Sequence, residues 1–210
     1  MSSTRHDRPR GKVHLGTNES PPTSFGEKTD VAGQGSSGRG DERAVSSEKK
    51  VSAAPKPVVV ERLTHADIPE IVALYKRVWD AFRPDLPQDL VKAWEPNALE
   101  FSSWMEGVTY FAARRDGKMI GAIGCEISEG TCRIVHLVSD PEARRQGVAT
   151  ALITAAVDWA RHSSVSSVWA DALARFTQAA LLFKKMGFTE CGVLHRHYFN
   201  EDVRLFETLL

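Results

Sequence analysis

Seven consecutive residues near the middle of the chain have the types that bind an anionic group. They are Arg144, Arg145, Gln146, Gly147, Val148, Ala149 and Thr150. The two arginines supply positive charge, and Gly147 lacks the Cβ that would keep a phosphate away from the main chain. If a helix begins here, its first N–H groups have no partner within the helix and lie at the positive end of its dipole. The segment therefore predicts a phosphate site built largely from backbone amides.

The flanking residues predict the elements that would position this site. Residues 134–138 form an apolar, β-branched run typical of a buried strand, and a short polar connection, Asp140-Pro141-Glu142, follows. Beyond Gly147, a helix to Arg161 is indicated by apolar residues at helical spacing: Ala149, Leu152, Ile153, Ala156, Val157 and Ala160. A Walker P-loop needs two glycines and a lysine, and a dinucleotide fingerprint needs three glycines, so this stretch with its single glycine is neither.

Two motifs resemble those of one known family. Arg144-x-x-Gly147-x-Ala149 resembles the pyrophosphate-binding motif (R/Q)-x-x-G-x-(G/A) of the GNAT acetyltransferases, and residues 179–188, a helix ending in Gly187-Phe188, resemble that family's second signature. The resemblance covers about residues 58–210. It implies that acetyl-CoA is the co-substrate and that its pyrophosphate lies on the amides of Arg145 through Thr150. The competing interpretation is a generic strand–helix unit in which Gly147 only relieves a turn.

The resemblance also implies roles for the strand before the helix and for one aromatic residue after it. The pantetheine arm would lie along a bulged strand edge at Leu137, Val138 and Ser139, and an amide there would stabilise the oxyanion formed at the thioester. Phe183 occupies the position where many family members carry a tyrosine acid. A phenyl ring has no proton to give. The glutamate base of some relatives is replaced by Arg133.

Candidates for proton transfer therefore come from other positions. His136 lies mid-strand between apolar neighbours; its unperturbed pKa suits a general base, but a structural histidine is the alternative. Glu126 is an acid within an apolar strand, either a base or an outward-facing surface residue.

Further candidates lie towards the carboxyl terminus. Alternation predicts His195 and His197 on one face of their strand and Tyr198 on the other. These residues would bind substrate or relay protons, or would only decorate the sheet. Asp171 would hold a cationic amine, or would serve as a helix cap or ion-pair partner.

The function that the resemblance implies is acetyl transfer from acetyl-CoA to a primary amine, either a small molecule or a protein amino group, by direct attack on the thioester. The alternative is a non-catalytic module that binds acyl-CoA as a regulatory ligand, which the missing tyrosine acid keeps open. Three tryptophans, Trp79, Trp94 and Trp104, would line an acceptor pocket, although aromatic residues at helical spacing more often belong to a core.

Composition limits the other possibilities. The 210 residues have a formal net charge of zero, 42% hydrophobic and 26% charged residues, which predicts neither a nucleic-acid nor a membrane partner. The three cysteines (Cys125, Cys132 and Cys191) are widely spaced in apolar surroundings, which indicates reduced, buried thiols and no metal site. With no signal-peptide pattern or apolar run long enough to span a membrane, we expect a cytoplasmic protein. By analogy with the family, a homodimer is expected.

Residues 1–57, rich in Ser, Gly and Pro and poor in large apolar side chains, are expected to form a disordered tail, and residues 58–210 a single GNAT-like domain. The expected order is β-α-α-β-β-β-α-β-α-β-β. It gives an α/β fold with a mixed, mostly antiparallel sheet of about seven strands flanked by four helices. The second helical region, about residues 88–106, is expected to be interrupted near Pro96-Asn97, and Asp116-Gly117 to form a hairpin turn.

Overall fold

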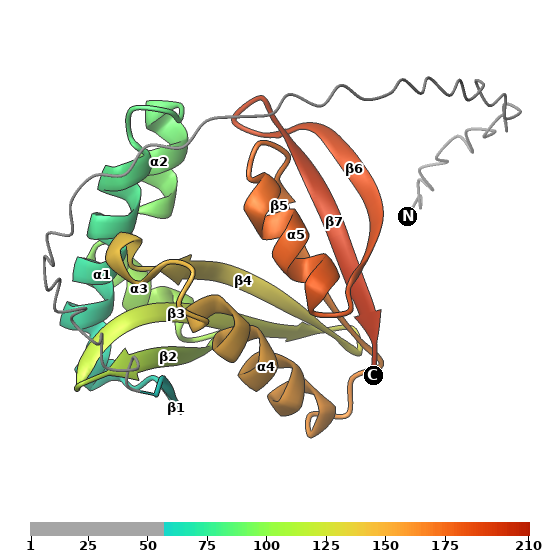
Figure 1. The fold of residues 1–210 in the computed structure, drawn as a ribbon, viewed down its shortest axis with the longest axis horizontal. Coiled ribbons are helices and arrows are strands. Elements are labelled where there is room, and N and C mark those ends of the chain that lie inside the picture. The colour runs from blue at the N-terminus through green and yellow to red at the C-terminus, as the bar shows by residue number, and fades with distance from the viewer. Residues whose placement is uncertain (1–56) are drawn as a thin grey trace, which may run out of the picture. The chain divides into compact units, whose positions relative to one another are not determined.

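The computed structural model describes residues 57–210, which form seven strands and five α-helices (Figure 1). The tail was expected at residues 1–57. Residues 1–56 of it lie outside the described residues, and only Pro57 lies within them. The strands are β1 (Val59–Arg62), β2 (Thr109–Arg115), β3 (Lys118–Ser128), β4 (Thr131–Ser139), β5 (Ser167–Leu173), β6 (Thr189–Tyr198) and β7 (Glu201–Leu209). The helices are α1 (Ile68–Phe82), α2 (Gln88–Trp94), α3 (Ala98–Trp104), α4 (Val148–Arg161) and α5 (Thr177–Lys185).

The helical region at residues 88–106 consists of two helices, so the domain has five α-helices where four were expected. Asn97 separates them because its side chain begins a new helix. Its Oδ1 accepts hydrogen bonds from the N–H groups of Leu99 (2.9 Å) and Glu100 (3.0 Å), and the Glu100 carboxylate accepts from the Asn97 N–H (2.8 Å). This is a reciprocal capping box, which favours a fresh helix start over continuation of α2.

The sheet has the strand order β1-β2-β3-β4-β5-β7-β6. Every neighbouring pair is antiparallel except β4 and β5, which are parallel. The mixed, mostly antiparallel sheet confirms the expected fold class. The turn at Asp116 and Gly117, with φ values of 53° and 77°, joins β2 to β3 as expected, because both positions need the left-handed region that glycine and aspartate tolerate.

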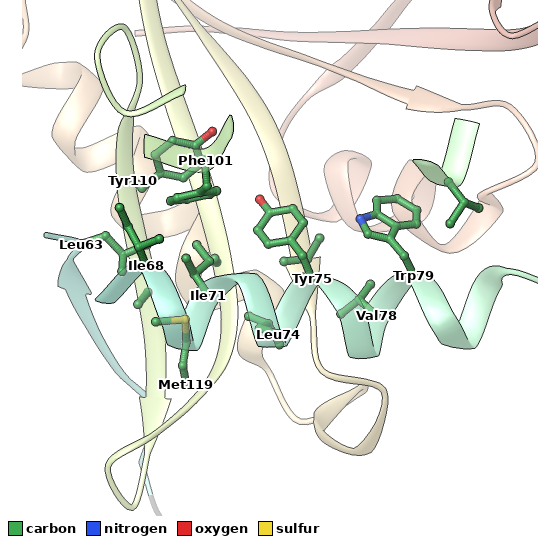
Figure 2. Packing of buried hydrophobic residues seen from close by; sticks show 14 of the residues in the cluster. Leu63, Ile68, Ile71, Leu74, Tyr75, Val78, Trp79, Phe101, Tyr110 and Met119 are labelled. Carbon is green, nitrogen blue, oxygen red and sulfur yellow. The ribbon is translucent and has the colours of Figure 1, made fainter. Parts of the chain in front are cut away.

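Helices cover both faces of the sheet. One core contains residues of α1, α2 and α3, and the second contains residues of α4 and α5. Figure 2 shows the apolar stripe of α1, in which Ile71, Leu74, Tyr75 and Val78 are at most 3% exposed. Because burial of one large apolar side chain contributes roughly 1.5–3 kcal/mol, this stripe holds α1 firmly against the sheet.

Gly121 of β3 fixes the distance between the sheet and the start of α4. A Cβ at this position would lie 2.6 Å from Val148 Cγ1 and 3.0 Å from Leu152 Cδ1. Only glycine therefore allows the first turn of α4 to pack so closely on β3. This contact holds the amino end of α4 against β3, one loop beyond the end of β4.

The cysteines and the helix lengths bear on the remaining expectations. Cys125 and Cys132 are buried free thiols, as expected, whereas Cys191 is exposed because it lies on the edge strand β6. Within residues 57–210, no group of His, Cys, Asp and Glu is arranged to hold a metal ion. No helix in the described part of the chain has the length and apolar character needed to cross a bilayer.

Candidate active site

β4 and β5 separate halfway along their length. The two strands pair from Thr131 only as far as Ile134 of β4, so the rest of β4 extends without β5 beside it. On its other side, the register of β4 with β3 shifts at His136 and Leu137, and His136 has a φ of 53°. This is a β-bulge, in which two residues face one on the neighbouring strand and bend the bulged strand. The sheet therefore opens along the residues that were expected to carry the pantetheine arm.

The amino end of α4 faces open space. Gly147 is the N-cap residue, with φ 82° and ψ 0°, and no side chain of the described residues caps it. A Cβ placed on Gly147 would meet no heavy atom of residues 57–210 within 4 Å. The first amides of the helix are therefore reachable, and the chemistry of these donors at a positive helix end suits a diphosphate.

Side chains from α1 and β2 fix the loop before α4. Asp140, with a side chain only 4% exposed, accepts hydrogen bonds from Arg77 Nε (3.1 Å) and from the Glu142 N–H (3.1 Å). The Arg115 guanidinium donates to Gln146 Oε1, and Gln146 Nε2 donates to the Glu142 carbonyl (2.9 Å). The loop is thus held from both sides, which lowers the entropy cost of ordering it around an anion.

The two arginines of the motif are exposed. The Arg144 guanidinium lies 4.6 Å from the centre of the Phe82 ring of α1, a cation–π contact. Arg145 has a φ of 60°. The phosphate contacts expected of both side chains stay a prediction.

A cavity of about 380 Å³ lies where β4 and β5 separate. Its lining includes Leu137 and Val138 of β4, residues 171–173 of β5 and aromatic residues of α1, α2, α3 and β6. Phe183 of α5 also lines it, although this ring is 2% exposed and stacks on Phe206 at 5.2 Å. The cavity therefore lies between the expected pantetheine path and the three amino-terminal helices.

His136 is held in the cavity wall by three aromatic residues. Its Nδ1 lies 2.6 Å from the Tyr110 hydroxyl, its carbonyl accepts from the Tyr75 hydroxyl (2.9 Å), and its ring stacks on Trp104 at 4.3 Å. Burial, assisted by the charge of Arg133, lowers the pKa of His136 to about 4. Because desolvation disfavours the charged form, the imidazole is neutral at pH 7.

A charged cluster faces the same cavity. Arg133 Nη2 donates to Asp171 Oδ1 (2.9 Å) and to the Tyr198 hydroxyl (2.8 Å), and Arg133 Nη1 lies 4.0 Å from Glu126 Oε2. Desolvation lowers the pKa of Arg133, but the hydrogen bond and charge of Asp171 outweigh it, so the net shift is upward. Burial raises the pKa of Tyr198, with a further contribution from Asp171. At neutral pH the phenol therefore carries its proton.

Of the proton-transfer candidates, His136, Glu126 and Tyr198 all line the cavity, although they come from three different strands. His195 and His197 are exposed and outside its lining, and His195 Nδ1 lies 3.2 Å from Asp202 Oδ2.

Comparison with known proteins identifies the family. A model described as the acetyltransferase (GNAT) family matches residues 69–188. The chain belongs to the GNAT family. Its members use acetyl-CoA, and a structural neighbour, the PaiA N-acetyltransferase of Thermoplasma acidophilum, was solved in complex with coenzyme A. That neighbour has 12% sequence identity and a TM-score of 0.60, with 71% of this chain and 98% of that chain covered.

Individual relatives share the GNAT domain at low identity. Human N-acetyltransferase 8 is 30% identical over 92 residues, 41% of this chain and 40% of that protein. The [ribosomal protein bS18]-alanine N-acetyltransferase of Escherichia coli K12 is 24% identical over 94 residues, 45% of this chain and 64% of that protein. The chain thus spans less than two thirds of the length of these curated relatives. The crystal structure of the Escherichia coli S18-alanine enzyme gives a TM-score of 0.61 at 20% identity, covering 73% of this chain and 94% of that one.

Some contacts of this GNAT domain could not be anticipated from the sequence. Tyr75 and Tyr110 hold His136 from 61 and 26 residues away, and Arg115 holds Gln146 from 31 residues away. At helical or strand spacing, both tyrosines look like core residues. A buried phenol needs a hydrogen-bond partner. That requirement was the one feature of the sequence that could have indicated that these tyrosines hold another residue.

Proposed function

We propose that this GNAT domain transfers the acetyl group of acetyl-CoA to a primary amine. One observation carries the proposal. The open amino end of α4 at Gly147 follows, after the loop of residues 140–146, the strand whose bulge lines the cavity. A diphosphate held at the first point would therefore direct the attached arm along β4 to the second.

The residues present fit the co-substrate at both ends. The amides of Arg145 through Thr150 would hold the pyrophosphate, and the edge of β4 at Leu137, Val138 and Ser139 would hold the arm. Because β5 does not pair with β4 beyond Ile134, backbone groups on that edge are available for hydrogen bonds. An amide aimed at the thioester oxygen stabilises the oxyanion that forms there, an effect often worth about 3 kcal/mol.

The cavity also offers groups for the amine and its proton. Asp171 and Glu126 attract the ammonium form, and an amine must lose a proton before or during attack on the thioester. His136 is neutral and can accept a proton only transiently, because its pKa is about 4. The Tyr198 phenol is protonated and is the group proposed to donate to the departing thiolate, a role that Phe183 cannot perform.

A thiol-release assay tests the proposal. Purified protein is incubated with acetyl-CoA and each of a panel of primary amines. For an amine that is a substrate, the rate of free CoA thiol release should rise with the amine concentration. The Gly147→Glu variant should release none above background. CoA binding without release for any amine would contradict the proposal. It would favour instead a non-catalytic acyl-CoA-binding module, the alternative that the phenylalanine at position 183 supports.

A further inference from the structure

The Arg133 side chain is held at the point where β4 and β5 separate. Arg133 pairs across the sheet with Trp169, and the pairing of the two strands ends one residue later at Ile134. Its Nε and Nη2 both donate to Asp171 Oδ1, over 3.3 Å and 2.9 Å, and its guanidinium lies 4.9 Å from the centre of the Trp169 ring. An ion pair and a cation–π contact with β5 therefore fix the guanidinium in the cavity wall.

Tyr198 lies at the end of a strand that has partly left its neighbour. The register of β6 with β7 shifts between Leu194 and Tyr198, so the ladder that would fix the direction of this half-buried ring is interrupted just before it. The Tyr198 hydroxyl accepts a hydrogen bond of 2.8 Å from Arg133 Nη2, which is 65 residues away. The ring also meets Trp94 of α2 edge to face at 5.7 Å. These two side chains hold the phenol in the cavity wall.

The direction of this hydrogen bond leaves the phenol able to act as an acid. A guanidinium has only N–H donors, so the Tyr198 oxygen is the acceptor and its hydrogen remains available to an acceptor in the cavity. The positive charge also stabilises the phenolate that remains once this proton has left. Burial raises the pKa of Tyr198 most strongly and Asp171 adds to this effect, whereas the charge of Arg133 lowers it.

No other group in the cavity lining can replace this charge. The charged and titratable groups nearest the phenol are Glu126 of β3, Arg133 and His136 of β4, Asp171 of β5, His197 of β6 and Glu201 of β7. Among the described residues that line the cavity, Arg133 is the sole arginine or lysine. His136 is neutral at pH 7 because burial lowers its pKa, and Glu201 is paired with Arg175 (2.8 Å). Without Arg133, the phenol would therefore face uncompensated carboxylates.

We propose that Arg133 is a positioning residue for proton transfer: it holds the Tyr198 hydroxyl in the cavity and stabilises the phenolate formed when that proton reaches the departing thiolate. The nitrogen of the neutral amine bonds to the thioester carbon, the carbon–sulfur bond breaks, and its electron pair goes to sulfur. Sulfur takes the Tyr198 proton, the amine releases one proton to water, and the phenolate regains one from water. The assignment rests on the acetyl transfer proposed above and adds the residue that controls its acid.

A double-mutant cycle tests whether Arg133 acts through Tyr198. The kcat for thiol release is measured at saturating acetyl-CoA with the most active of n-butylamine, spermidine and a short peptide with a free amino terminus. Tyr198→Phe should lower kcat by about a hundredfold, the size of one general acid, and Arg133→Gln by about thirtyfold, the size of one charge-assisted hydrogen bond. The double variant should lose no more than about threefold beyond Tyr198→Phe, because the arginine then has no hydroxyl to hold. A further loss of about thirtyfold in the double variant would overturn the proposal, since Arg133 would then act independently of Tyr198.

Two further variants separate this effect from a loss of folding. Arg133→Lys keeps a positive charge beside Asp171, so it should recover part of the kcat lost in Arg133→Gln, and the cycle can be run with it if the glutamine variant does not fold. Arg161→Gln removes another arginine–aspartate pair of 2.9 Å, with Asp158 of α4 and outside the cavity lining, and should keep full kcat. Equal losses in Arg133→Gln and Arg161→Gln would overturn the proposal.

Absorbance titration of tyrosinate separates this inference from the proposed reaction. The chain has three tyrosines, and burial raises the pKa of Tyr75 and Tyr110, each 1% exposed, more strongly than that of Tyr198, which should therefore ionise first. This transition, identified by its absence in Tyr198→Phe, should move to higher pH in Arg133→Gln. A shifted transition without thiol release from any amine would disprove the proposed function but support control of the phenol by Arg133. Thiol release with an unshifted transition would overturn that control and leave acetyl transfer intact.

Discussion

The two halves of the site are built in different ways. The proposed cofactor half is one contiguous segment, residues 137–150, whose donors are backbone amides at the end of β4 and the start of α4. The proposed acceptor half is assembled from side chains of α1, α2, α3, β3, β4, β5 and β6. A backbone site needs only a local conformation and a missing Cβ, so a short motif specifies it. A side-chain site needs the complete fold to bring its members together.

The largest expected effect comes from breaking the backbone half. Gly147→Glu places a side chain where φ is 82° and fills the open space before α4 with a negative charge. A left-handed conformation costs a non-glycine residue about 1–2 kcal/mol, and the carboxylate repels a diphosphate. We expect affinity for CoA to fall by roughly a thousandfold, measured by calorimetry.

Gly130→Glu is the matched control for this variant. Gly130 has a φ of 78°, and its Cβ would also meet no described atom within 4 Å, but it lies in the turn between β3 and β4. It should show the same backbone strain with unchanged CoA affinity. Equal losses in both variants would mean that strain, and not an anion site at Gly147, causes the effect.

The next effect concerns His136 in the acceptor half and the dependence of protein stability on pH. His136 has a pKa of about 4 in the folded state, against about 6.5 in an unfolded chain. Between these values the unfolded chain binds the proton more readily, so stability present above pH 6.5 is lost as the pH falls towards 4. Between pH 6.5 and pH 4, the contribution of His136 should lower the free energy of unfolding by about 3 kcal/mol.

Chemical denaturation at pH 6.5 and pH 4 measures this decrease in the free energy of unfolding. The His136→Asn variant should not show the part due to His136, because asparagine does not titrate. Asparagine also tolerates the φ of 53° at this position. His162→Asn, at an exposed histidine, is the control and should keep the loss. The same pH dependence in His136→Asn and in the unmodified protein would show that His136 is not desolvated.

A smaller effect distinguishes binding of the amine from binding of CoA. Asp171→Asn removes a carboxylate that is 14% exposed, so kcat/KM for the amine should fall by about thirtyfold, the size of one charge-assisted hydrogen bond. The KM for acetyl-CoA should not change. Glu126→Gln, at a side chain 44% exposed, should have a weaker effect. A raised KM for acetyl-CoA in Asp171→Asn would contradict the division into two halves.

The smallest effect is expected at the boundary between the halves. Phe183→Tyr restores the phenol that many family members carry, and activity should be preserved or raised by less than about tenfold. Steady-state kinetics with circular dichroism as a check on folding measures this. A large loss of kcat in a folded variant would mean that Phe183 does not lie beside the thiol.

The success of sequence-based reasoning follows the same division. The loop, the start of α4 and the helical face of residues 152–160 were predicted because each depends on residues close in sequence. Trp79 was expected either to line a pocket or to belong to a core, and it is buried on α1, but nothing in its spacing shows that its N–H group lacks a partner among residues 57–210. The regular alternation expected along β6 is interrupted near its end by a register shift before Tyr198 and a φ of 52° at Arg196. Tyr198 lines the cavity while His195 and His197 do not, and the faces assigned to these three residues stay a prediction.

A crystal structure of the protein with CoA bound tests the central claim most directly. It should show the pyrophosphate within hydrogen-bond distance of the amides from Arg145 through Thr150, with the pantetheine arm between β4 and β5 and its thiol in the cavity. A pyrophosphate bound elsewhere, or an arm that does not enter between these strands, would contradict the account.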